Sequence, residues 1–123
     1  MKFSINHIAI TTTDPSRLSR FYTEILGLEE LKIHYFDNGT VRSVWLALND
    51  LTILMLEQQE INKRSGIGYH LLAFDVSGEE KDGWEKKLIS SGINIYKGSD
   101  YTIYFQDPDG NRIGLSNYRL TQE

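Results

Sequence analysis

Imidazole and carboxylate groups are the side chains with which this sequence could carry out chemistry. It contains three histidines and 17 acidic residues but no cysteine. The lack of cysteine excludes disulfides, thiolate nucleophiles and cysteine-type zinc sites. The sequence also contains no phosphate-binding glycine loop, no dinucleotide fingerprint and no local Ser-His-Asp signature. The candidates that remain for a site are His7, His34, Glu57 and His70.

The charge and hydropathy of the chain argue against nucleic acid and membranes as its partners. The 123 residues include 13 basic and 17 acidic side chains, for a net charge of −4. A nucleic-acid-binding domain would be expected to carry a basic patch. No apolar run approaches the ~20 residues that cross a bilayer, and the first ten residues do not resemble a signal peptide. We therefore expect one cytoplasmic domain over 1–123, with no nucleic-acid or membrane partner.

The elements that would position these groups begin with a strand and a helix. A β-branched stretch at 4–11 predicts the strand. Asp14 as N-cap, followed by Pro15, predicts the start of a helix that ends at Gly27. Three further strands are expected at 31–36, 41–48 and 51–56.

The same order is expected again in the second half of the chain. A polar, glycine-containing stretch at about 60–68 predicts a linker. After it we expect a strand at 69–76, a helix at 79–91 and strands at 93–96, 101–105 and 112–116. This internal repeat predicts an α+β fold of two β-α-β-β-β modules, about 1–59 and about 69–123. Joined within one chain or across a dimer, the two curved sheets would enclose a cleft.

Three segments carry a resemblance to a known family. They are HIAI at 7–10, RFYTEILGL at 20–28 and YFQDPDGNRI at 104–113. In this order they resemble the vicinal-oxygen-chelate superfamily, the glyoxalase, bleomycin-resistance and dioxygenase proteins. The resemblance implies the two-module fold, a small-molecule ligand and a homodimer. In catalytic members it also implies one divalent metal, held by a histidine on the first strand of each module and a carboxylate on the last strand.

The resemblance assigns His7 to a metal-ligand position, but the other positions hold different residues. Gly114 stands where the family has glutamate. Matching 73–76 to the family pattern puts Leu71 at the second histidine position, and strand alternation then turns His70 toward the helix layer. We therefore expect no metal or other cofactor.

A shifted set of ligands is the alternative. The spacing from Phe21 to Trp84 on the two helices equals the spacing from His7 to His70, which favours His70 as a ligand, and a β-bulge could bring it to the cleft. Glu57 would complete the set. A Zn, Ni, Mn or Fe ion bound there would make the chain a lyase, isomerase, dioxygenase or thiol transferase.

Glu57 itself is expected to point away from the cleft. Laying 51–56 on 111–116 pairs Leu54 with Gly114, and alternation then turns Glu57 outward. His34 lies in a predicted strand without any motif around it, so we assign it no role.

The main expectation is a protein that binds a small molecule without the usual catalytic metal. Aromatic rings near the cleft would stack on the ligand, and Arg42 would pair with an anionic group. The expected ligand-binding residues are His7, Arg42, Trp45, Leu54, Leu71, Tyr101 and Tyr104. A structural or regulatory dimer with a vestigial cavity is a further alternative.

Overall fold

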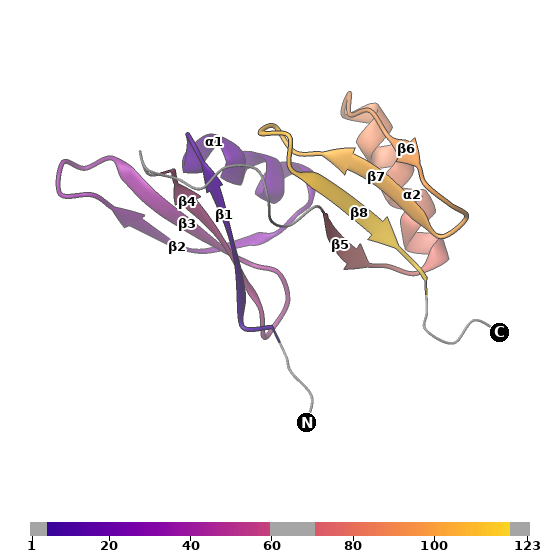
Figure 1. Ribbon diagram of the computed structural model, residues 1–123, viewed down its shortest axis with the longest axis horizontal. Coiled ribbons are helices and arrows are strands. Elements are labelled where there is room, and N and C mark those ends of the chain that lie inside the picture. The colour runs from indigo at the N-terminus through magenta and orange to yellow at the C-terminus, as the bar shows by residue number, and fades with distance from the viewer. Residues whose placement is uncertain (1–4, 60–70, 119–123) are drawn as a thin grey trace. The chain divides into compact units, whose positions relative to one another are not determined.

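The chain folds as two compact units, 1–65 and 66–123. The computed structural model describes residues 5–59 and 71–118. The predicted linker at 60–68 and His70 lie outside the described residues. Each unit contains a four-stranded sheet and a helical segment (Figure 1). This arrangement confirms the predicted α+β fold of two similar modules.

The first unit contains a mixed sheet in the order β1-β4-β3-β2. Its elements are β1 (His7–Thr12), α1 (Pro15–Arg20), η1 (Phe21–Ile25), β2 (Glu29–Tyr35), β3 (Val41–Ala47) and β4 (Ile53–Gln58). The first strand runs parallel to β4, and the other pairs are antiparallel. The first and last strands of the unit therefore lie side by side, which requires the helical crossover between them.

The first helix begins as predicted and ends in a wider turn. The Asp14 side chain accepts a hydrogen bond from the Arg17 backbone N–H at 3.1 Å, and Pro15 occupies the first turn. From Phe21 onward the helix has π geometry. The rings of Phe21 and Tyr22 are adjacent in sequence, yet both are buried, with their centroids 5.4 Å apart. The wider turn accommodates both rings against the sheet.

The second unit repeats this arrangement in the order β5-β8-β7-β6. Its elements are β5 (Leu72–Asp75), α2 (Gly78–Ser90), β6 (Tyr96–Lys97), β7 (Thr102–Gln106) and β8 (Arg112–Ser116). Its first strand, β5, is again parallel to its last, β8. No helix among residues 5–59 and 71–118 is long and apolar enough to cross a membrane.

The strand predicted at 93–96 differs most from the structure, because the end of α2 uses part of it. Gly92 has a φ of +79°, and its N–H binds the Ile89 carbonyl at 3.0 Å. The next N–H, of Ile93, binds the Leu88 carbonyl, also at 3.0 Å. These two bonds form a Schellman motif, which satisfies the last carbonyls of the helix. Only Tyr96 and Lys97 remain to pair with β7.

The second helix begins with a capping box. The Ser77 hydroxyl accepts a hydrogen bond from the Glu80 N–H at 3.0 Å, and the Glu80 carboxylate accepts one from the Ser77 N–H at 2.8 Å. These bonds, first that from the Ser77 backbone and then that with its side chain, hold the pKa of Glu80 below its ordinary value of 4.5.

Each core lies between a sheet and its helix. In the first unit the buried set is Leu18, Tyr22, Val44, Leu46, Leu54 and Leu56. In the second it is Leu88, Ile103, Phe105, Ile113 and Leu115. Because side chains alternate along a strand, the residues between these core positions point to the opposite face of each sheet.

Leu54 is expected to be a core residue whose truncation destabilises the first unit. Replacing a fully buried leucine by alanine removes apolar contacts and leaves a cavity, which costs about 2–5 kcal/mol. Leu51 is 79% exposed and provides a control of the same residue type. Urea unfolding of Leu54→Ala should show this loss, and Leu51→Ala should stay within about 0.5 kcal/mol of the parent. Equal losses in the two variants would contradict this assignment of the core.

The capping box predicts a pH-dependent contribution to stability. A carboxylate whose pKa is lowered in the folded state stabilises the protein above its unfolded pKa, and this contribution is lost as the pH falls through the folded value. Glu80→Gln should therefore unfold more easily than the parent at pH 7, and the difference should shrink as the pH falls below 4.5 toward the lowered pKa of Glu80. Thermal unfolding at several pH values measures this, with Glu79→Gln as the neighbouring control. A difference that does not change with pH would refute it.

Candidate functional site

The sheet of the first unit has one face that α1 does not cover, and we call this its helix-free face. It carries His7, Ala9, Thr11, Lys32, His34, Ser43, Trp45, Ala47, Ile53, Met55 and Glu57. Paired residues in a sheet point to the same side, which gives this assignment. His7 is exposed there, and its Nδ1 lies 2.9 Å from the Asn6 carboxamide oxygen.

Leu54 does not belong to this face. It pairs with Ile8 and Leu46 and is fully buried toward the helix. Leu54 was expected to line the ligand site together with His7 and Trp45, but it does not share their face of the sheet. The repeat alignment used to place it was shifted by one residue. Its neighbour Met55, which pairs with Ala9, points to the helix-free face instead.

Glu57 lies on the helix-free face, which corrects the expectation that it points away. It pairs with Thr11, four residues after His7 on the same strand (11 − 7 = 4). At about 3.3 Å per residue, His7 and Glu57 are separated by about 13 Å along the strands. Metal–ligand bonds are about 2.0–2.2 Å long, so these two side chains cannot bind one ion together. The register therefore separates His7 from Glu57, and His70 lies outside the described residues.

Three neighbouring residues of this face hold buried polar atoms without a partner. Within residues 5–59 and 71–118, Nδ1 of His34, Oγ of Ser43 and Nε1 of Trp45 make no hydrogen bond. The rings of His34 and Trp45 contact each other, with their centroids 4.6 Å apart. An unpaired buried donor or acceptor costs about 1–3 kcal/mol. The sequence patterns did not indicate His34 or Ser43, and the signal that could have found them is their alternation with core residues.

Arg42 lies beside this cluster at an irregular point of the sheet. The pairs His34–Ser43 and Tyr35–Val41 leave Arg42 as the extra residue of a β-bulge. Its side chain is exposed. The structure therefore does not assign it to the face that carries Trp45, and its predicted role with an anionic group stays a prediction.

The helix-free face of the second unit places Leu71, Ala73, Tyr104 and Gly114 close together. Gly114 pairs with both Ala73 and Tyr104, and Leu71 lies two residues before Ala73. Alternation continued by one residue beyond β5 puts Leu71 on the same side, and it is half-buried. His70, the competing residue, lies outside the described part of the chain. Neither a leucine nor a glycine side chain can bind a metal.

The Tyr104 ring occupies the space above Gly114. A Cβ at Gly114 would lie 3.4 Å from the ring, and a Cβ at Gly98 would overlap it. The Arg112 guanidinium lies over the same ring, 4.4 Å from its centroid. Two glycines and an arginine thus hold this ring in place on the helix-free face.

Tyr101 does not share this face by alternation. It precedes β7 by one residue and has the parity of the buried Ile103. Its ring contacts Tyr118 edge to face, with centroids 5.4 Å apart. The register therefore does not place the Tyr101 ring beside Tyr104, where both could stack on one ligand.

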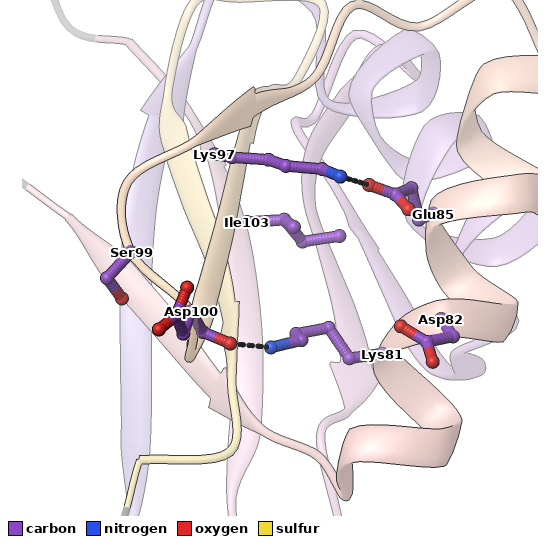
Figure 2. A pocket seen from close by; sticks show the side chains of 7 residues that line it. All are labelled: Lys81, Asp82, Glu85, Lys97, Ser99, Asp100 and Ile103. Carbon is purple, nitrogen blue, oxygen red and sulfur yellow. Dashed lines mark hydrogen bonds and ion pairs between the residues drawn. The ribbon is translucent and has the colours of Figure 1, made fainter.

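A surface pocket of about 200 Å³ lies on the other side of the second sheet, between α2 and β6 (Figure 2). Its lining residues are Lys81, Asp82, Glu85, Lys97, Ser99, Asp100 and Ile103. Ile103 belongs to the helix-covered face. The pocket is therefore separate from the face that carries Tyr104.

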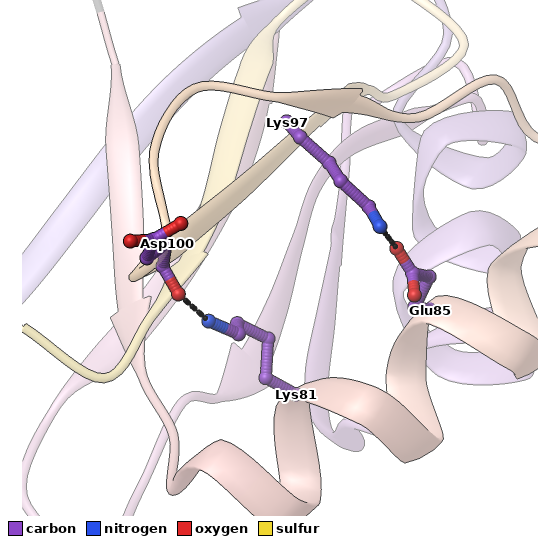
Figure 3. A network of polar contacts seen from close by, with 4 residues as sticks. All are labelled: Lys81, Glu85, Lys97 and Asp100. Atoms are coloured by element: carbon purple, nitrogen blue, oxygen red, sulfur yellow. Dashed lines mark hydrogen bonds and ion pairs between the residues drawn. The ribbon is translucent and has the colours of Figure 1, made fainter.

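Two lysines span this pocket in opposite directions (Figure 3). Lys97 reaches from β6 to the Glu85 carboxylate at 3.3 Å. Lys81 reaches from α2 to the Asp100 carbonyl at 2.7 Å and to the Asn117 side chain at 3.1 Å. An exposed ion pair contributes only about 0–1 kcal/mol to stability. The contacts of the two lysines link α2 to β6 and to the turn before β7.

The metal donors of the described residues do not make a complete site. No group of three or more His, Asp or Glu side chains that could hold a metal occurs within residues 5–59 and 71–118. Of the family ligand positions, only that of His7 carries a donor. A catalytic metal site ordinarily takes three protein ligands.

Comparison with known proteins identifies close relatives. The chain is 33% identical over 121 residues to metallothiol transferase FosB of Bacillus licheniformis, covering 90% of this chain and 73% of that protein. It is 32% identical over 123 residues to FosB of Staphylococcus saprophyticus, covering 91% and 75%. These names state a metal, which contradicts our expectation that no metal cofactor is involved.

Solved structures share the fold. The fosfomycin resistance protein FosX of Listeria monocytogenes, complexed with Mn(II) and sulfate, aligns with a TM-score of 0.75 at 20% identity, over 98% of this chain and 96% of that one. A glyoxalase/dioxygenase of Nostoc punctiforme aligns with a TM-score of 0.72 at 25% identity, over 91% and 88%. The family model of the Glyoxalase/Bleomycin resistance protein/Dioxygenase superfamily matches residues 4–115. The chain therefore belongs to this superfamily.

Proposed function

We propose that this chain is a metal-dependent enzyme that joins a thiol to a small electrophilic substrate. The observation that carries the proposal is the 33% identity, over 90% of the chain, to a protein named metallothiol transferase. Thiol transfer was one of the enzyme classes expected from the sequence as an alternative to binding alone. The relatives now favour that alternative over a binding protein without metal.

His7 is the residue we assign to the reacting centre. It is exposed on the helix-free face of the first unit. The Asn6 carboxamide oxygen can only accept a hydrogen bond, so the contact of 2.9 Å places the ring proton on Nδ1. Nε2 then keeps its lone pair for a metal or a proton. The described residues do not complete a metal centre, so the proposal assigns no step to a metal.

On each helix-free face, taken by itself, we assign substrate contact to an aromatic ring. Trp45 in the first unit and Tyr104 in the second each offer a ring on the side opposite the core. Leu71 adds apolar surface near Tyr104. A FosX structure from Listeria monocytogenes contains 1S,2S-dihydroxypropylphosphonic acid, which leads us to propose an acidic small molecule as the substrate class. A homodimer remains a prediction from the family resemblance.

Turnover should be detectable with fosfomycin and a small thiol such as L-cysteine. In the expected reaction the sulfur bonds to an epoxide carbon, the carbon–oxygen bond breaks and the oxygen takes up the thiol proton. Phosphorus NMR follows the product in the presence of Mn²⁺, Mg²⁺, Ni²⁺ or Zn²⁺. His7→Ala should lower the rate by roughly tenfold or more, because it removes the assigned imidazole.

The exposed Lys86→Ala provides a control that should keep the parent rate. Elemental analysis of protein purified without chelator measures the bound metal independently of turnover. The proposal fails if no product forms with any of these metals, or if His7→Ala reacts as fast as the parent.

A further inference from the structure

Met55 is the sulfur-bearing side chain on the helix-free face of the first unit. The chain has two methionines, Met1 and Met55, and no cysteine. Met55 on β4 pairs with Ala9 on β1 and with Trp45 on β3, so these three side chains point to the same side of the sheet. The Met55 side chain is half-buried. Its thioether is therefore a reversibly oxidisable group at the border between this face and solvent.

The residue opposite Met55 has a hydrogen-bond donor without an acceptor. Nε1 of Trp45 is buried and makes no hydrogen bond within residues 5–59 and 71–118. An indole N–H can only donate, so what it lacks is an acceptor. Directly opposed residues of antiparallel strands have Cβ atoms about 4.5–5.5 Å apart, which two long side chains can span. A thioether sulfur is only a weak acceptor, and it does not satisfy the indole here.

Oxidation of the Met55 sulfur would supply the missing acceptor. A sulfoxide carries a polar oxygen, whereas the thioether is apolar. The oxygen arrives on a flexible side chain with three rotatable bonds, so it requires no preformed cavity beside the indole. In most cores a sulfoxide disrupts packing, because its oxygen is buried without a partner. Beside Trp45 the oxygen and the buried N–H can satisfy each other.

We propose that Met55 is an oxidation site whose sulfoxide accepts a hydrogen bond from the Trp45 indole. The oxidant is a peroxide. Its O–O bond breaks, one oxygen forms a bond to the Met55 sulfur, and the other oxygen takes the proton of the first and leaves as water when the oxidant is hydrogen peroxide. The sulfur loses two electrons and the peroxide gains them. This inference goes beyond the proposed function and does not depend on it.

The imidazole of His34 is the competing acceptor for the indole. Its ring centroid lies 4.6 Å from that of Trp45, with the two rings at 55°, and its Nδ1 is also buried without a partner in the described part of the chain. If the indole N–H bound His34 Nδ1 after a small rotation of either ring, oxidation of Met55 would leave that N–H unchanged. The state of the indole N–H before and after oxidation therefore separates the two arrangements.

The first test treats the folded protein with hydrogen peroxide. Peptide mass mapping should find one added oxygen on Met55, with Met1 scored separately. In protein labelled with nitrogen-15, the indole N–H resonance of Trp45 should move downfield when Met55 is oxidised, and its exchange with water should become slower. The chain has two tryptophans, so Trp84→Phe assigns the Trp45 signal. The Trp84 signal, from the second unit, should not move.

The second test compares thermal unfolding before and after oxidation. Trp45→Phe keeps an aromatic ring and removes the donor, so oxidation should lower its Tm by about 2–8 °C more than it lowers that of the parent. Trp84→Phe, the same change in the second unit, should respond as the parent does. Met55→Leu has a similar volume and no sulfur, so peroxide should not change its Tm.

The proposal is overturned if peroxide leaves Met55 unmodified in the folded protein. It is equally overturned if the Trp45 indole signal does not move when Met55 is oxidised, or if oxidation lowers the Tm of the parent and of Trp45→Phe by the same amount. Should Trp45→Phe fail to fold, the indole signal of Trp84→Phe before and after oxidation decides alone.

Discussion

The parallel pairing of the first and last strand in each unit is the constraint on which the candidate site depends. In the first unit it pairs His7 with Ile53, and in the second it pairs Ala73 with Gly114. Once this pairing is set, alternation decides for every strand which side chains join the core and which point away from it. The helices follow from the same pairing, because parallel neighbours need a crossover that packs on one side of the sheet. Because the helix covers one face of the sheet, the helix-free face is the one on which a site can form.

The fold could be predicted because its signals are local and repeated. The Asp14 cap with Pro15, the glycine ends of both helices and the turn at 107–110 each specify a short stretch of backbone. The site was harder to predict, because its residues depend on register across strands. Laying one half of the sequence on the other shifted Leu54 by a single position, and this error moved Leu54 and Glu57 to the wrong sides of the sheet.

The remaining errors have a different physical origin. Ser43 and His34 lie in no motif, and a linear pattern does not reveal that their side chains hold buried atoms without a hydrogen-bond partner in the described part of the chain. The expectation of no metal came from counting donors at family positions in one chain. The name metallothiol transferase, carried by the relatives, contradicts that expectation. Leu71 and Gly114 nevertheless provide no side chain that could bind a metal. Sequence identity over most of the chain indicates the family, whereas the number of donor side chains at a few positions indicates whether this chain by itself can hold the metal.

The approach of Gly98 to the Tyr104 ring has a consequence for how this surface can change over generations. A single methyl group at position 98 would take the volume that the aromatic ring now fills. The backbone at 98 and the orientation of the ring therefore constrain each other. A lineage that gains any side chain at 98 must also relocate its tyrosine and uncover the bare backbone at 114, which would open that strand to a new residue.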